Sequence, residues 1–143
     1  MKKKCSAMML VFCLCGIAMA QENEPVVSLQ EQPGVRSVLS FGAKGDGKTD
    51  DTQAFQKALN TVGKEGGGMV LAPRGDFLIR GRLDVPPHVT LEGVFRAPTA
   101  RSQMQGTTLL AVDGRGNADG EPFIMLRDNS TLKGLAVFYP EQK

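Results

Sequence analysis

The sequence contains no tryptophan, one tyrosine and one histidine among its 143 residues. Its three cysteines, Cys5, Cys13 and Cys15, all lie close to the N-terminus. If that segment is removed on export, the remaining chain has no thiol, which excludes disulfides and thiolate chemistry from its mechanism. No apolar run reaches the roughly 18 residues that a membrane-spanning helix needs. The scarcity of aromatic side chains leaves few residues that could stack on a sugar ring.

The positive charge of the chain is concentrated at its start. Beyond residue 20 the chain carries 14 basic and 15 acidic residues, because Lys2, Lys3 and Lys4 account for three of its 17 basic residues. This balance excludes a nucleic-acid-binding protein that relies on bulk positive charge. A hydrophobic content of 41% with 22% charged residues is too apolar for a disordered chain. The 17 glycines and 8 prolines favour one turn-rich β domain over a helical bundle.

The first 20 residues have the pattern of a signal peptide. Lys2, Lys3 and Lys4 precede an apolar segment from Ala7 to Ile17, and Ala18-Met19-Ala20 is a small-x-small cleavage site. We therefore predict a signal peptide over residues 1–20 and a bacterial protein that is secreted or periplasmic, with no membrane attachment after cleavage. An uncleaved membrane anchor is the alternative, and the shortness of the apolar segment counts against it. Residues 21–34 are polar and aperiodic, which predicts a flexible lead-in.

One amphipathic helix is predicted near residues 50–62. Its apolar residues follow the helical spacing i, i+3, i+4, i+7; they are Phe55, Ala58, Leu59 and Val62. Asp50, with Gln53 three residues later, predicts the N-terminal cap, and Gly63 predicts the end of the helix. Before the helix, Ser37–Phe41 has the pattern of a short strand, and residues 42–49 have that of a turn-rich loop.

After the helix the chain has only short apolar or β-branched runs separated by turn residues. We predict strands at Met69–Ala72, Phe77–Arg80, Leu83–Val85, Val89–Leu91, Thr108–Val112, Phe123–Leu126, Thr131–Leu132 and Leu135–Phe138. A weak repeat relates residues 89–93 to residues 130–134, with Thr108-Leu109 between them. These spacings indicate a solenoid of about three coils, in which each turn of chain stacks on the next. Chance recurrence of common strand residues is the alternative.

Residues 42–49, which read GAKGDGKT, match the phosphate-binding motif G-x-x-x-x-G-K-[ST] between a predicted strand and a predicted helix. Asp113, at the end of an apolar run, resembles the magnesium-holding acid of nucleotide hydrolases. That hypothesis conflicts with export, with the two carboxylates of Asp50 and Asp51 beside any bound phosphate, and with the lack of repeated βα units. In the structural alternative, the glycines make tight turns and the acids cap the helix.

A longer pattern connects this loop to a known family. Residues 37–55, which read SVLSFGAKGDGKTDDTQAF, closely resemble the opening of the pectate lyase superfamily, which includes rhamnogalacturonase- and polygalacturonase-like proteins. Residues 67–79, 83–86 and 89–93 extend the similarity over the chain from Val35 to Tyr139. The resemblance implies an all-β fold, a right-handed parallel β-helix whose first helix covers its N-terminal end. It also implies secreted action on pectin-type or other acidic polysaccharides.

Members of this superfamily are longer, and they carry their catalytic groups on later coils. The resemblance therefore implies that residues 35–143 are the N-terminal part of the β-helix of a polysaccharide-degrading enzyme, without the catalytic coils. It leaves open whether the parent protein hydrolyses or eliminates, and which glycan it takes. A non-catalytic carbohydrate-binding or adhesive β-helix is the alternative.

No catalytic, cofactor-binding or metal-binding residue is predicted. Glycoside hydrolysis needs two carboxyl groups about 5–10 Å apart. Most acids of the strand region have turn contexts instead. The acids of this region are Asp76, Asp84, Glu92, Asp113, Asp119, Glu121 and Asp128. A β-helix can still bring two of them together from adjacent coils.

Basic and apolar residues of the strand region also have structural interpretations. Arg80, Arg82 and Lys133 could serve lyase chemistry, but we interpret them as charges at strand edges. His88, between two apolar neighbours, is interpreted as a turn residue. The apolar run Leu135–Tyr139 predicts self-association, and we expect the chain by itself to cleave no glycan.

Overall fold

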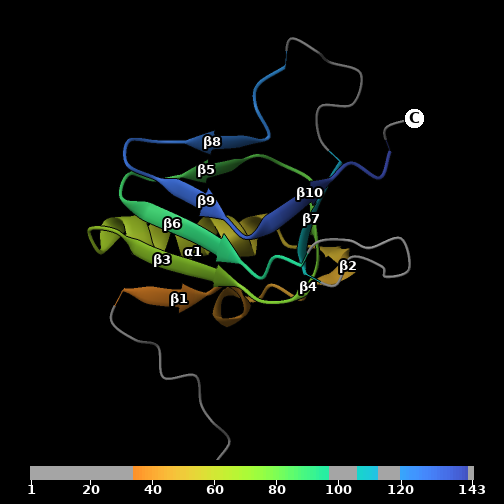
Figure 1. Ribbon diagram of the computed structural model, residues 1–143, viewed down its shortest axis with the longest axis horizontal. Helices are drawn as coiled ribbons and strands as arrows, with labels where there is room; N and C mark the ends of the chain where they lie inside the picture. The colour runs from red at the N-terminus through yellow and green to blue at the C-terminus, as the bar shows by residue number, and fades with distance from the viewer. Residues whose placement is uncertain (1–33, 97–105, 113–119, 142–143) are drawn as a thin grey trace, which may run out of the picture.

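The computed structural model describes residues 34–96, 106–112 and 120–141 (Figure 1). The predicted signal peptide and residues 21–33 of the predicted lead-in lie outside this part of the chain. The elements in chain order are β1 (Val35–Ser37), the 3-10 helix η1 (Val38–Phe41), β2 (Asp46–Asp50), α1 (Thr52–Lys64), β3 (Gly68–Ala72), β4 (Gly75–Ile79), β5 (Leu83–Val85), β6 (Val89–Gly93), β7 (Thr107–Ala111), β8 (Ile124–Leu126), β9 (Thr131–Lys133) and β10 (Leu135–Phe138).

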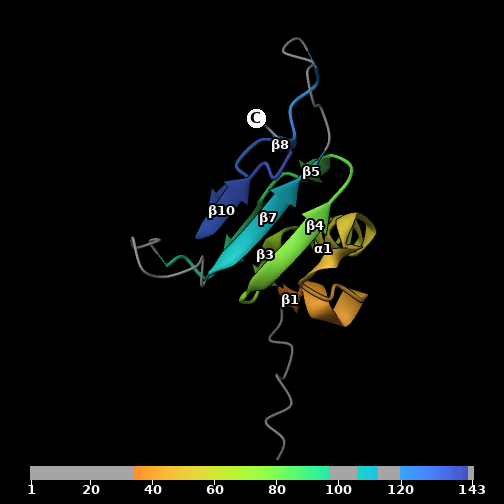
Figure 2. The same ribbon diagram turned by 90° about the vertical axis from the view of Figure 1, so that its right-hand side faces the viewer.

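Every strand pair in the described part of the chain is parallel. The strands form three sheets, in the orders β1-β3-β6-β9, β2-β4-β7-β10 and β5-β8. The chain visits the sheets in turn, so β3-β4-β5 and β6-β7-β8 are complete coils, with β1-β2 before them and β9-β10 after them (Figures 1 and 2). This arrangement is a parallel β-helix with one helix in its first coil, and the predicted fold is confirmed.

The weak sequence repeat corresponds to one sheet of the solenoid. Residues 90–92 of β6 pair in register with residues 131–133 of β9, so the two matching segments are neighbours on successive coils. Thr108-Leu109 was predicted as an intermediate unit of the same repeat, and that prediction is wrong. It lies on β7, in a different sheet, because one coil of this solenoid uses three strands.

Apolar residues stack along the solenoid axis in register. Phe77 of β4 pairs with Leu109 of β7, and Val70 of β3 pairs with Leu91 of β6; all four are fully buried. Phe55 of α1 meets Phe77 edge to face, with ring centroids 5.1 Å apart. Burial of each such side chain contributes about 1.5–3 kcal/mol, so the stacked interior holds the coils together.

Helix α1 takes, in the first coil, the place that β5 and β8 take in the next two coils. It packs against β5, β3 and η1. Its buried face consists of Ala54, Phe55, Ala58, Leu59 and Val62. This face contains the four apolar residues predicted from helical spacing, so the amphipathic helix is confirmed.

The start of α1 differs from the prediction. Asp50, predicted as the cap, is the last residue of β2, and the helix begins at Thr52. Asp51 precedes the helix without capping it, because its carboxylate accepts hydrogen bonds from the amides of Lys44 and Gly45 instead. The carboxylate of Asp50 still accepts a hydrogen bond from the amide of Thr52, the first helical residue, from one position before the cap.

The end of α1 is also displaced. Gly63 lies inside the helix, which continues to Lys64. A Cβ atom on Gly63 would lie 2.8 Å from the Cβ atom of Pro86, closer than side chains approach. The glycine therefore permits close packing between the helix and the next coil, rather than marking a helix end.

The segment before the helix is less extended than predicted. The strand predicted over Ser37–Phe41 is wrong beyond Ser37, where η1 begins. Ser37 accepts a hydrogen bond from the amide of Leu39 through its hydroxyl oxygen, which starts the turn. Gly42, with φ of 96°, closes η1 in the left-handed region. The predicted loop is shorter than expected, because β2 already begins at Asp46.

A column of left-handed residues marks the turn into the β1-β3-β6-β9 sheet. Gly67, His88 and Asn129 occupy the same place on successive coils, with φ angles of 112°, 62° and 55°. The amide of Gly68 donates to the carbonyl of His88, whose own amide donates to the carbonyl of Asp128. His88 is therefore a turn residue, as the sequence predicts.

Candidate functional site

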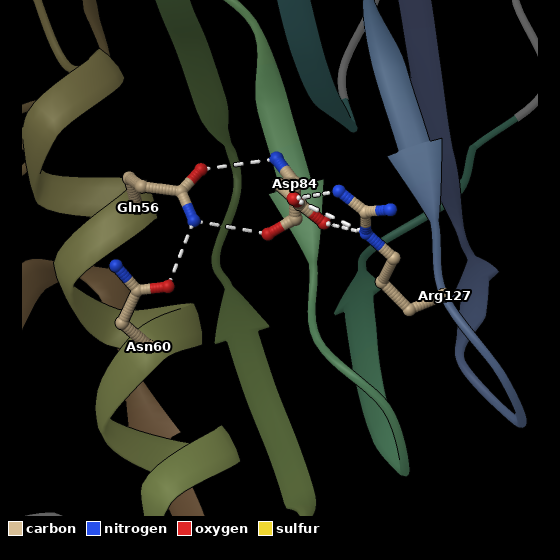
Figure 3. Close-up of polar contacts among 4 residues, drawn as sticks. All are labelled: Gln56, Asn60, Asp84 and Arg127. Atoms are coloured by element: carbon tan, nitrogen blue, oxygen red, sulfur yellow. Dashed lines mark hydrogen bonds and ion pairs between the residues drawn. The ribbon is translucent and has the colours of Figure 1, made fainter.

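Polar side chains cross from the helix to the β5-β8 sheet at one point (Figure 3). The Gln56 side chain of α1 accepts a hydrogen bond from the amide of Asp84 and donates one to its carbonyl, both at 3.0 Å. Its Nε2 atom also donates to the Asn60 side chain. A carboxamide has the donor and acceptor of a peptide group, so Gln56 pairs with β5 as a neighbouring strand would.

The Asp84 side chain forms an ion pair with Arg127, which directly follows β8. Arg127 donates from Nε to Oδ1 at 2.9 Å and from Nη2 to Oδ2 at 2.6 Å. This pair lowers the pKa of Asp84 and raises that of Arg127. Both side chains are about half exposed, so water screens the pair. Asp84 is held ionised, which makes it unsuited to act as a general acid.

A second ion pair joins adjacent coils on another sheet. Lys133 of β9 lies with its Nζ atom 3.0 Å from an Oε atom of Glu92 on β6, its register partner. The sequence predicts Lys133 as an edge charge and Glu92 as one of the acids of the strand region. The structure brings the two together across the sheet, an arrangement that the weak repeat could have indicated.

The motif at residues 42–49 does not form a phosphate-binding loop. Its backbone donors bond to carboxylates of the chain itself, those of Lys44 and Gly45 to Asp51 and those of Lys48 and Thr49 to Asp46.

Lys48 and Thr49 of this motif lie within β2 rather than at the start of a helix. The amides of Thr49 and Lys48 lower the pKa of Asp46 to about 2, so its negative charge is maintained at ordinary pH. This geometry supports the turn interpretation of the glycines. Asp50 accepts a hydrogen bond from the amide of Thr52 at the helix start, whereas Asp46 and Asp51 accept from amides of the loop and do not cap the helix. Asp113, which resembles the magnesium-holding acid of nucleotide hydrolases, lies outside the described residues.

Two carboxylates of adjacent coils occupy neighbouring positions. Asp46 of β2 and Asp76 of β4 are register partners on adjacent coils. Asp46 directs its carboxylate to its own loop, through the bonds to Lys48 and Thr49, so this carboxylate is not available to donate a proton in acid catalysis. Within residues 34–96, 106–112 and 120–141, no group of three His, Cys, Asp or Glu residues is arranged to hold a metal ion.

The remaining candidates are dispersed over the surface. Glu121 and Asp128 are exposed, and Asp119 lies outside the described residues. Arg80 and Arg82 are exposed in the connection between β4 and β5, where the amide of Arg80 donates to the hydroxyl of Thr52. Arg80 lies near Asp50 and Asp128 lies near Arg127, so these described members of the set have different neighbours. Gln56 is the polar residue that sequence reasoning missed, because a glutamine on a helix carries no sequence signal for strand pairing.

Comparisons with known proteins agree with this architecture. A family model described as "Rhamnogalacturonase A/epimerase, pectate lyase-like" matches residues 35–139, most of the chain. The chain belongs to this family. Among solved structures, the A-module of the mannuronan C-5 epimerase AlgE4 from Azotobacter vinelandii is similar, with a TM-score of 0.54 and 25% identity over 71% of the chain and 28% of the module.

Curated relatives of this pectate lyase-like chain include an enzyme and a phage protein. A maize exopolygalacturonase is 29% identical over 88% of the chain and 35% of its own length. The preneck appendage protein of Bacillus phage PZA is 41% identical over 79% of the chain and 11% of its own length. The chain thus spans about a third or less of these relatives. No helix in the described ranges is long and apolar enough to cross a membrane.

Proposed function

We propose that residues 35–143 form the N-terminal coils of an exported β-helix protein that acts on an acidic polysaccharide. The observation that carries this proposal is the family match over residues 35–139, combined with the parallel β-helix. The names of two similar proteins, a polygalacturonase and a mannuronan epimerase, both refer to polymers of uronic acids. Export rests on the signal-peptide pattern of residues 1–20.

The bond-breaking groups are assigned to coils other than those described. Two observations support this assignment. The relatives are about three times as long as the chain or longer, and two acids of the described coils already form ion pairs with basic side chains of the chain itself. Asp84 is held by Arg127 and Glu92 by Lys133. The described coils then serve as a folded end and as glycan-binding surface, with hydrolysis or elimination performed elsewhere on the β-helix.

A second candidate is a non-catalytic carbohydrate-binding or adhesive β-helix. The match to the phage preneck appendage protein favours it, because that relative shares most of this chain and is named as an appendage. Both candidates require glycan binding by the solenoid surface. They differ in whether any coil of the parent protein breaks a bond.

The last described coil adds a proposal about assembly. Val137, Phe138 and Tyr139 are 40%, 44% and 37% exposed, and Leu126 of β8 is 48% exposed. Exposed apolar side chains beside strand edges promote association between copies. We expect the purified chain to self-associate with rising concentration, and size-exclusion chromatography combined with light scattering would measure this.

The test of the function uses the purified chain with polygalacturonate, rhamnogalacturonan and alginate. Reducing ends report hydrolysis, and ultraviolet absorbance of unsaturated products reports elimination. We expect binding to at least one of these polymers without cleavage of any. Cleavage by the chain would place catalytic groups on the described coils. If the chain binds none of the three polymers, the proposed function is refuted.

A further inference from the structure

Exposed apolar side chains gather at the corner where the chain passes from the β1-β3-β6-β9 sheet to β4 and β7. Leu39, Leu71 and Val94 are 47%, 37% and 47% exposed. Phe95, at 63%, is the most exposed of the large apolar residues that the structure describes. Apolar side chains that gather on the surface of a soluble protein mark an interaction site. This corner therefore has the character of an interface.

One side of the corner is hollowed. The hollow has a volume of about 300 Å³, and its apolar lining includes Leu39, Leu71, Pro73 and Val94. Among the lining residues, Glu92 is the one that carries a charge. A hollow of this size can accept one aromatic side chain, which buries about 150–250 Å² in such a place. The lining favours an apolar group that is accompanied by a positive charge.

The other side of the corner carries an aromatic side chain with a positive charge beside it. Phe95 does not line the large hollow; it lies on the far side of Val94, where it lines a smaller one with Thr108 of β7 and Ala136 of β10. Arg96 follows it in the chain and is exposed. The two sides of the corner are thus complementary to each other in shape and in charge.

A two-fold axis through Val94 exchanges these two sides. In a two-fold dimer both copies use the same surface, so each feature must find its complement on an identical chain. Rotation about this axis brings Phe95 of one copy to the hollow of the other and Arg96 toward Glu92. Every dimer then contains this contact twice. Aromatic residues and arginine are also the types enriched in the centres of protein interfaces.

We propose that two copies of this chain form a two-fold dimer through this corner, with Phe95 of each copy in the hollow of the other. Arg96 of one copy donates to the Glu92 carboxylate of the other. Lys133 already lies 3.0 Å from one Glu92 oxygen, and a carboxylate has acceptor sites for a second donor. This interface is separate from the exposed apolar residues of the last coil, and it does not depend on which glycan the β-helix binds.

The experiment measures the dissociation constant of the dimer by sedimentation equilibrium of the purified chain. Phe95→Ser should raise this constant at least about 100-fold, because each dimer loses two aromatic anchors. Phe138→Ser is the matched control, since it makes the same change at an exposed phenylalanine of the last coil. It should leave the dissociation constant of the dimer unchanged.

Charge reversal tests how the two copies are arranged. Arg96→Glu and Glu92→Arg should each be monomeric, because like charges meet twice in a dimer of either variant. An equimolar mixture of the two variants should recover dimers, since both contacts across the axis then join opposite charges. Circular dichroism of each variant alone checks that the β-helix is retained.

The outcomes distinguish a second copy from other occupants of the hollow. A chain that stays monomeric at every concentration refutes the interface. If association is lost in Phe138→Ser and kept in Phe95→Ser, copies meet through the last coil and the interface is wrong. A mixture of the charge variants that stays monomeric refutes the two-fold arrangement. If a glycan oligomer shifts the methyl NMR signals of Leu71 and Val94 in a monomeric chain, the occupant is a glycan and not a second copy.

Discussion

Replacing Gln56 with alanine should destabilise the solenoid at the junction between helix and sheet. The substitution removes both hydrogen bonds to the backbone of Asp84. Each bond contributes about 0.5–1.5 kcal/mol net, and the edge of β5 is left without partners on that side. Since Asp84 is partly exposed and water can replace some of the loss, we expect the free energy of unfolding to fall by about 2 kcal/mol, or about 10 °C in Tm.

The assay is urea unfolding, followed by circular dichroism, with Gln53→Ala as the matched control. Gln53 is exposed on the same helix, and the two substitutions change helix propensity equally. Gln56→Glu keeps the acceptor for the Asp84 amide but loses the donor, so it should lie between the two. If Gln56→Ala unfolds within about 0.5 kcal/mol of Gln53→Ala, the idea that a side chain replaces a strand neighbour is incorrect.

Three further predictions test single residues. Asp46 has a pKa lowered from 3.8 to about 2, so its contribution to stability is complete above pH 3.8 and is lost as pH falls through 2. In Asp46→Asn, the free energy of unfolding should therefore fall less steeply over that pH range. The same pH dependence in both proteins would contradict this. Gly63→Ala should lower stability by about 1–3 kcal/mol in urea unfolding, because the new Cβ meets Pro86; a gain in stability would show that helix propensity dominates. His88→Val should cost about 1–2 kcal/mol in thermal unfolding, because a β-branched residue does not tolerate φ of 62°, whereas His88→Asn should be neutral; equal loss in both would point to a role for the imidazole.

The sequence predicts the elements whose signal is periodic. Leu83–Val85 and Leu135–Phe138 have the predicted bounds, because short apolar runs between turn residues have few alternatives to a strand. The buried face of α1 follows from helical spacing for the same reason. The match between residues 89–93 and 130–134 even predicts which strands are neighbours, since stacked coils place similar residues in register.

The errors come from residues whose partners are distant in sequence. Asp50 satisfies the local pattern of a helix cap, but Asp51 and its bonds to the loop decide where the strand ends and the helix begins. Gly63 has the pattern of a helix terminator, but the structure favours glycine at this position because Pro86 approaches it closely. The ion pair of Asp84 and Arg127 joins residues 43 positions apart, and no spacing in the sequence indicates it.

The helix in the first coil gives the solenoid a direction of growth. Parallel strands can add neighbours at either end of a sheet, so an unmodified β-helix could polymerise in both directions like a filament. Here α1 replaces the first strand of one sheet and satisfies its own backbone, and Lys48 and Thr49 of β2 donate to Asp46 rather than to another strand. Both features cover that end of two of the three sheets. The strands β8, β9 and β10 at the other end carry no such helix, so further coils are accepted more readily on their side.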